Sequence, residues 1–385
     1  MTINFLPNSY AKDLLETVAL CGEYPWQSLD LLGKNRLMYV RTLKKIRNES
    51  FMTVSGSAEM KTIRLTKKGL TQVYEHLGEE YLDHYLNMSE GHKFRGGGKA
   101  SGNTGAIQTW RHHRMAEILV VLKSLNVNVW SFQKPNIDLN LNAKKTIEPN
   151  FNIFYTSKEI KNADAEQSKK TNFTRIMGTL FCQGGIYPIY HTNKGLMKWQ
   201  QQGEMKAQIL VEDIVNCNYN FSFDKPFIAS RSIMFGKDPM LISKILQSNG
   251  GKRMQNNFEL LSFDNTYQNI HFITLDENGK KQLQILMSKN WQEKILTLLF
   301  DKSVLLDKNK TVDADAFINN TFILSFLDGD IGRLKRFKQS YKINPKNKFK
   351  IICFNWQKNA IKDYMPEAEI EVIDADLFLN SFQER

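Results

Sequence analysis

The chain has 385 residues, 42% of them hydrophobic, and a formal net charge of +12. This length predicts two or three domains with a real core, and the charge favours a polyanionic partner. No apolar run reaches the roughly 18 residues needed to cross a bilayer. The N-terminus lacks a signal-peptide pattern, and the four cysteines are too far apart for a zinc or disulfide framework. We therefore expect a cytoplasmic protein with buried thiols and no membrane contact.

The first 89 residues predict a small DNA-binding module. Three helical segments and then two strands are expected, over residues 11–20, 26–31 and 35–47 and residues 51–54 and 61–65. The sequence Ser55-Gly-Ser57 forms the turn between the strands, and Thr66-Lys-Lys-Gly69 closes the hairpin before a fourth helix at 70–77. This order is typical of a winged helix-turn-helix, which places one helix in a DNA groove.

The third helical segment has two different faces at about 100° per residue. Its apolar side is formed by Leu37, Val40, Leu43 and Ile46. Its polar side carries Lys34, Met38, Arg41, Thr42, Lys45 and Asn48. Arginine and lysine can contact guanine edges or phosphates, and asparagine can read adenine. The hairpin adds Lys61 and Arg64, which we expect to reach a neighbouring row of phosphates. The alternative is an ordinary solvated helix face.

Residues 90–105 predict a linker because they are rich in glycine, polar and basic. The glycine spacing does not fit a phosphate loop, so Arg95 and Lys99 are expected to contact a DNA backbone. A long helix is expected at 106–125, where Arg111 and Arg114 flank two histidines and favour further phosphate contacts. Adjacent histidines diverge on a helix and do not chelate one metal.

The rest of the chain predicts an α/β region in two parts, residues 106–222 and 223–385. Further strands are expected at 126–132, 151–155, 175–182, 185–190, 227–234, 258–261, 271–275, 321–327, 349–354 and 370–373. The pair around Gly184 and Gly185 predicts a hairpin. Helices are expected at 197–215, 239–247, 280–300, 332–341 and 357–364, with 157–170 as a charged helix or loop. Strands that alternate with helices favour parallel pairing.

A winged helix, a linker, a helix, a strand pair and another helix, in that order, resemble the plasmid replication-relaxation family over somewhat more than the N-terminal half of the chain. The resemblance implies a restriction-endonuclease-like α/β domain after the winged helix, and a role in replication or in relaxation and mobilisation of plasmids and related elements. The family's nuclease strand often carries Arg-Pro-Asp-Gly, in which Asp is a metal ligand. Here the matching stretch is Arg175-Ile-Met-Gly178, with Met177 at the acid position.

The metal-binding acids of such a nuclease are therefore missing from the expected strands. The next strand, Tyr187-Pro-Ile-Tyr-His191, also has no carboxylate. Mg²⁺ requires hard oxygen ligands, which methionine does not supply. The resemblance thus implies a nuclease-like scaffold that has degenerated, with Mg²⁺ as a cofactor only if the domain is active.

Three acids remain as catalytic candidates, each with a structural alternative. Glu204 and Lys206 have Glu-x-Lys spacing, but on a helix they face different sides, which favours a surface role. Glu117 lies on the long helix, where a solvated charge is the alternative. Asp328 follows a strand, where α/β proteins place ligands, although a turn or helix cap also explains it.

We therefore hypothesise an α/β (α+β overall) protein of a plasmid or integrated mobile element that binds double-stranded DNA and acts in replication initiation or DNA relaxation. It has a winged helix, a nuclease-like region and a C-terminal β-α-β region, and it could form a homodimer. Two alternatives stay open. One is a metal-dependent nickase with an atypical set of acids, and the other is a winged-helix transcription regulator.

Overall fold

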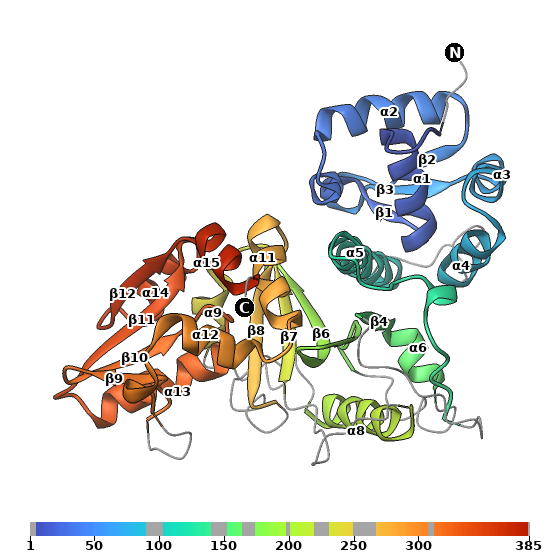
Figure 1. Ribbon diagram of the computed structural model, residues 1–385. Coiled ribbons are helices and arrows are strands. Elements are labelled where there is room, and N and C mark those ends of the chain that lie inside the picture. Colours follow the sequence, from blue (N-terminus) through green and yellow to red (C-terminus); the bar gives the residue numbers. More distant parts are fainter. Residues whose placement is uncertain are drawn as a thin grey trace. The chain divides into compact units, whose positions relative to one another are not determined.

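The computed structural model describes residues 5–89, 103–139, 152–163, 174–197, 201–218, 231–248, 267–306 and 312–383. The chain divides into two compact units, Met1–Pro135 and Asn136–Arg385, and it is mixed α/β as expected (Figure 1). Within the described ranges, no helix combines the length and apolar character needed to cross a bilayer.

Unit 1 consists of helices around a three-stranded sheet. Its elements are α1 (Tyr10–Cys21), β1 (Tyr24–Pro25), η1 (Trp26–Leu32), α2 (Arg36–Asn48), β2 (Met52–Ser55), η2 (Ala58–Met60), β3 (Thr62–Leu65), α3 (Lys67–His76), α4 (Glu79–Ser89), α5 (Asn103–Ser124) and η4 (Ser131–Gln133). The strand order is β1-β3-β2, and both pairings are antiparallel. The predicted hairpin is therefore confirmed, with the short strand β1 added at the free edge of β3.

Local capping explains where the helices of unit 1 begin. The Asn35 side chain accepts hydrogen bonds from the backbone N–H groups of Leu37 and Met38, which starts α2. The Thr66 hydroxyl accepts from the Gly69 N–H and starts α3. A Cβ at Gly69 would lie 2.0 Å from the Phe51 carbonyl oxygen. Glycine is therefore required where the hairpin closes against the helix.

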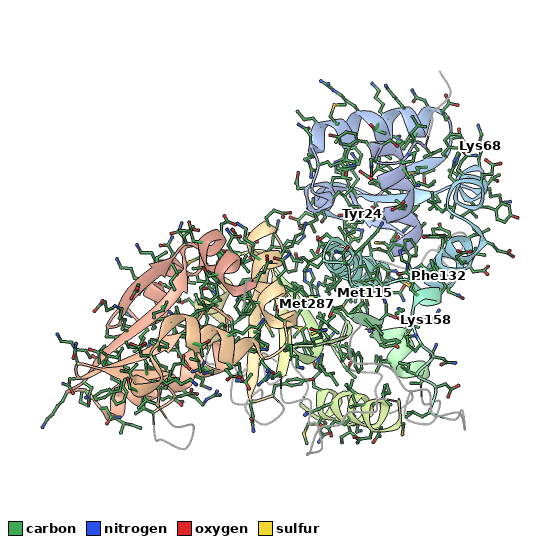
Figure 2. The ribbon with its side chains drawn as sticks, viewed as in Figure 1. Tyr24, Lys68, Met115, Phe132, Lys158 and Met287 are labelled. Carbon is green, nitrogen blue, oxygen red and sulfur yellow. The ribbon has the colours of Figure 1, made fainter. Side chains whose placement is uncertain are left out.

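Helix α5 packs within unit 1, although the predicted domains placed this helix in the nuclease-like region 106–222. His113 of α5 lies 2.8 Å from the Thr62 hydroxyl on β3, and Glu117 accepts a hydrogen bond from Ser28 on η1. Tyr24 is fully buried in the interior of the unit (Figure 2). The boundary between the compact units thus follows Pro135 and not the glycine-rich segment 90–105.

Unit 2 contains two sheets. The first part is built from β4 (Ile153–Thr156), α6 (Ser157–Asn162), β5 (Gly178–Cys182), β6 (Gly185–Asn193), α8 (Gln201–Asn218), β7 (Arg231–Gly236), α9 (Leu241–Gln247) and β8 (Asn269–Thr274). Its five strands are ordered β4-β5-β6-β7-β8. The pairings β4–β5 and β5–β6 are antiparallel, whereas β6–β7 and β7–β8 are parallel.

The C-terminal part of unit 2 is a second, mostly parallel sheet. It contains α11 (Glu277–Met287), α12 (Trp291–Leu299), η6 (Lys302–Val304), β9 (Ala316–Ile318), β10 (Thr321–Ser325), α13 (Ile331–Ile343), β11 (Lys348–Phe354), η7 (Asn355–Gln357), α14 (Lys358–Tyr364), β12 (Glu369–Ile373) and α15 (Ala375–Gln383). The order is β12-β11-β10-β9, with β9 antiparallel to β10. One hydrophobic core extends through both sheets, from Tyr155 and Tyr190 to Leu334 and Ile351.

Several sequence-based expectations need correction. Residues 126–132 do not form a strand, and this segment ends in η4. The helix expected at 280–300 is two helices, α11 and α12, because Asn290 adopts left-handed backbone angles between them. Cys217 is exposed, whereas Cys21 and Cys353 are buried as expected. The strand expected at 258–261 and most of the 90–105 linker lie outside the described residues.

Candidate nucleic-acid interface

The buried face of α2 is rotated about the helix axis relative to the apolar face that the sequence predicted. Tyr39, Leu43 and Ile46 are fully buried at i, i+4 and i+7 spacing. Leu37, which was expected in the core, is 67% exposed, and Val40 is only half-buried. The Tyr39 ring packs edge-on against Tyr10, with centroids 4.8 Å apart. This partner on α1 sets the rotation of the helix.

Four cations project from the remaining surface of α2: Arg41, Lys44, Lys45 and Arg47. All four are exposed, and within the described residues none forms a salt bridge with a carboxylate. Figure 2 shows nitrogen-tipped side chains rising from the outer side of this helix. Asn48 is exposed beside them, whereas Thr42 is half-buried. Lys44 and Arg47 were not predicted from the sequence, although their three-residue spacing could have indicated a second row of cations.

Two of the predicted DNA-contacting cations in unit 1, Lys34 and Arg64, are paired with acids. Lys34 lies 2.6 Å from Asp13 in a solvent-exposed ion pair. Arg64 lies 2.6 Å from Glu23, which is fully buried. Both predicted DNA contacts thus have an acidic partner within unit 1. Lys61 lies 4.1 Å above the Trp26 ring, where a cation–π interaction holds it.

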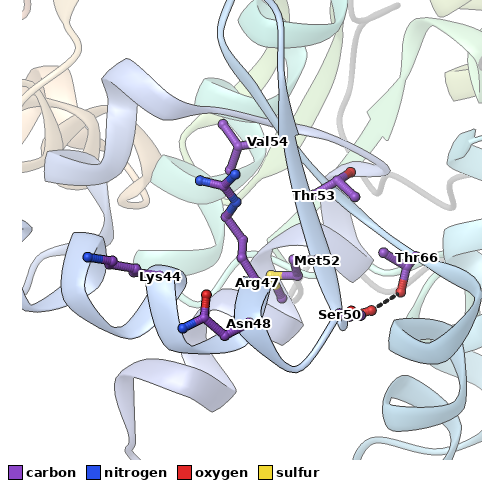
Figure 3. Close-up of a pocket in the computed structure, with 8 residues that line it drawn as sticks. All are labelled: Lys44, Arg47, Asn48, Ser50, Met52, Thr53, Val54 and Thr66. Carbon is purple, nitrogen blue, oxygen red and sulfur yellow. Dashed lines mark hydrogen bonds between the residues drawn. The ribbon is translucent and has the colours of Figure 1, made fainter.

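A hollow of about 510 Å³ lies beside the C-terminal half of α2 (Figure 3). Its lining comes from α2, from the α2–β2 connection, from β2 and from the N-cap of α3: Lys44, Arg47, Asn48, Ser50, Met52, Thr53, Val54 and Thr66. A hydrogen bond of 2.6 Å from the Thr66 hydroxyl to the Ser50 carbonyl fixes one side of it. The hollow therefore combines two cations with hydroxyl and amide groups, which suits an anionic ligand.

The remaining predicted DNA contacts do not belong to the α2 surface. Arg111 is exposed and Arg114 is half-buried on α5, which lies on the opposite side of the three-stranded sheet from α2 (Figure 1). Arg95 and Lys99 lie outside the described residues. The structure thus brings together Arg41, Lys45 and Asn48 from the predicted set.

Glu117 is a buried structural acid of unit 1. It is 2% exposed, and it accepts a hydrogen bond from the buried Ser28 hydroxyl of η1. The alternative of a solvated helix charge is therefore wrong. Glu117 belongs to unit 1, whereas the other two candidate acids belong to unit 2.

Glu204 is fully buried in unit 2, although a helix-surface role was favoured. Its carboxylate accepts hydrogen bonds from the Arg175 N–H (2.6 Å) and the Tyr190 hydroxyl (3.0 Å). Tyr190 is in turn 2.8 Å from the Tyr267 hydroxyl. Burial raises the pKa of Glu204 to about 7. Lys206 is exposed, so the two groups do face different sides of α8.

Asp328 is buried in the loop after β10. Its carbonyl oxygen accepts a hydrogen bond from Nδ1 of His271 (3.0 Å), and one carboxylate oxygen accepts from the Asp330 N–H (3.2 Å). Burial and then the Asp330 carboxylate raise the pKa of Asp328. Asp330 caps α13 by accepting from the Gly332 N–H. The loop is therefore packed between β8 and α13 as a buried turn.

The candidate acids do not fit a Mg²⁺ site of the nuclease type. Met177, at the position of the expected ligand, is buried and offers only a thioether. Glu204 and Asp328 are each held by different protein groups. In the parts of the chain that the structure describes, no three histidine, cysteine, aspartate or glutamate side chains are grouped to hold a metal ion. Neither Glu204 nor Asp328 therefore belongs to a described ligand group of the kind that two-metal hydrolysis of a phosphodiester requires.

Comparison of the chain with models of protein families, with curated proteins and with solved structures gives no match.

Proposed function

We propose that this chain binds double-stranded DNA through α2. The order of α1, β1, η1, α2 and the β2–β3 hairpin supports a winged helix, in which the helix before the hairpin enters the major groove. Two cations on neighbouring turns of α2, Arg41 and Lys45, would contact phosphates or guanine edges. The hollow at Lys44 and Arg47 would receive a phosphate of the adjacent backbone.

One observation carries this proposal: in the part of the chain that the structure describes, the exposed cations of α2 have no acidic partners, whereas two nearby cations of unit 1 do. Arg41, Lys44, Lys45 and Arg47 gather on one exposed surface without acidic partners among the described residues. Lys34 and Arg64, by comparison, are paired with Asp13 and Glu23. An unpaired basic surface attracts a polyanion, because each phosphate contact releases condensed counterions.

For unit 2 we propose a scaffold role in a protein of the replication-relaxation type, from a plasmid or an integrated mobile element. The antiparallel β4–β5–β6 meander, the α8 connection and the parallel strand β7 support a restriction-endonuclease-like arrangement. Met177 and the uncharged strand β6 support the loss of its metal chemistry. Unit 2 would then supply an assembly surface and not cleave DNA.

The DNA-binding proposal is tested by removing two charges from α2. The double variant Arg41→Gln/Lys45→Gln is compared with Lys358→Gln/Lys362→Gln, which removes two exposed cations one turn apart on α14 of unit 2. Both variants change the net charge equally. Fluorescence anisotropy with a labelled random-sequence duplex, measured over a range of salt concentrations, gives the affinity and its salt slope.

We expect the α2 variant to bind at least about tenfold more weakly, with a salt slope smaller by roughly two. The α14 variant should bind like the wild type. Because Lys45 lies in the last turn of α2, where a cation also stabilises the helix, circular dichroism must show unchanged helix content. Equal losses in both variants would mean that only net charge matters, and no loss in either would remove α2 from the proposal.

The proposed loss of nuclease activity has a separate test. Supercoiled plasmid is incubated with the full chain and Mg²⁺ or Mn²⁺, and the products are separated on an agarose gel. We expect the plasmid to stay supercoiled, because the carboxylates needed for two-metal hydrolysis are absent from β5 and β6. Relaxed circles that disappear with EDTA would instead support a nickase with an atypical set of acids.

A further inference from the structure

The first turn of α2 exposes two neighbouring apolar side chains. Leu37 is 67% exposed and Met38 is 39% exposed. Single exposed apolar residues are common on protein surfaces and need no explanation. Here, however, Leu37 stands one turn before Arg41 and two turns before Lys45, so these three side chains follow one stripe of the helix. Arg41 also touches Met38, with Nη1 4.0 Å from Sδ.

The position of this apolar pair within α2 is informative. In helix-turn-helix proteins, the N-terminal residues of the reading helix contact base edges. The asparagine cap at Asn35 leaves Leu37 and Met38 in the first turn of the helix. The cations lie further along, at and after Arg41. The stripe is thus apolar where base edges are expected, and basic where phosphates are expected.

The chemistry of the major groove offers one apolar feature, the C5-methyl group of thymine. We propose that Leu37 and Met38 contact thymine methyl groups, so that the ligand of α2 is duplex DNA with thymine in the contacted step. This inference rests on the proposed function. It assigns Leu37 and Met38 a part in sequence preference, whereas cations that contact phosphates contribute affinity for any sequence.

The test removes the methyl group from the DNA without altering its hydrogen-bonding pattern. A pool of short random-sequence duplexes is enriched for binding to the full chain. The enriched duplexes are then resynthesised with deoxyuridine in place of thymidine, and both forms are titrated by fluorescence anisotropy. The ratio of the two affinities measures what the methyl groups contribute.

We expect the wild type to bind the thymidine form about fourfold more tightly for each methyl group in contact. Leu37→Ala combined with Met38→Ala should bring the ratio close to one, while binding to the deoxyuridine form stays unchanged. The matched control is Leu377→Ala, a leucine of unit 2 that is 70% exposed. It should keep the wild-type ratio.

The outcomes separate this inference from the proposed function. Salt-sensitive binding with equal affinity for both forms overturns the methyl contact and leaves duplex binding intact. Failure to enrich or bind any duplex overturns both. If the Leu37 and Met38 changes instead dissociate a dimer in sedimentation velocity and keep the affinity ratio, the pair is a contact between two copies of the chain, and the inference is wrong.

Discussion

Glu204 shows how the surroundings of one carboxyl group determine its chemistry. Burial raises its pKa to about 7, above its ordinary value of 4.5. The folded chain therefore holds this proton more tightly than the unfolded chain does. The resulting stabilisation is complete below about pH 4.5 and is lost as the pH rises towards 7. At about 1.4 kcal/mol per pKa unit, the loss amounts to roughly 3 kcal/mol.

Glu204→Gln should remove this pH dependence, because an amide stays neutral and can still accept from the Arg175 N–H. Urea denaturation at pH 5 and pH 8 measures it. We expect the variant to gain stability relative to the wild type by up to roughly 3 kcal/mol between the two pH values. Glu293→Gln, a change at an exposed acid on α12, serves as the control. A difference that is the same at both pH values would show that Glu204 is ionised throughout.

Single residues were the part of the site that the sequence predicted least well. Glu204 and Asp328 were identified as candidate acids, but their burial was not visible, because it depends on contacts with other elements, such as Tyr190 for Glu204 and His271 for Asp328. The Tyr190 hydroxyl on β6 donates to Glu204, and the Tyr267 hydroxyl, just before β8, pairs with the Tyr190 hydroxyl. Hydrophobic periodicity describes neighbours along one element, and it contains no information about such distant partners.

The N-cap of α2 permits a test at the scale of one element. The Asn35 side chain accepts from two backbone donors of the first turn, the N–H groups of Leu37 and Met38. Asn35→Ala should lower the free energy of unfolding of unit 1 by about 1 kcal/mol. Asn48→Ala, at the other end of the same helix, caps no backbone group there and should have a smaller effect in the same denaturation experiment. Equal effects would contradict a role for the cap.

Helix and strand positions in unit 1 were predictable because local signals coincide there. Asn35 begins α2, and Thr66 and Gly69 close the hairpin and begin α3. The rotation of α2 was not predictable, because both Leu37 and Tyr39 are large apolar residues. The choice depends on Tyr10 and Asp13 of α1, which contact the Tyr39 ring and hydroxyl. Strand β1 was missed because its two residues are too few to show alternation.

At the scale of the whole molecule, the division into compact units does not coincide with the segment that has the composition of a linker. The glycine-rich segment at 90–105 has the composition of a linker between domains. Helix α5, which follows it, nevertheless packs against β1 and η1, so the segment separates two parts of one compact unit. Composition indicates which segments can lie outside a hydrophobic core, but only tertiary contacts show which elements pack together in one unit.

The two compact units should unfold separately. A substitution at a buried acid of one unit therefore destabilises that unit alone. Glu117→Ala removes the acceptor of the Ser28 hydroxyl in unit 1. Asp330→Ala removes the cap of α13 and an acceptor of the Ile270 N–H in unit 2. Each change should destabilise its own unit by about 2 kcal/mol or more, because it leaves buried donors unsatisfied. Differential scanning calorimetry should therefore show two transitions, of which each variant lowers one.

The temperature at which duplex binding is lost then shows which unfolding transition belongs to the DNA-binding unit. If α2 carries the DNA interface, binding measured on heating should disappear with the transition that Glu117→Ala lowers. Duplex binding should be unaffected when Asp330→Ala lowers the temperature of the other unfolding transition. A single transition lowered by both variants would mean that the units stabilise one another. Binding that disappears with the transition of unit 2 would place the interface outside α2, however basic that helix is.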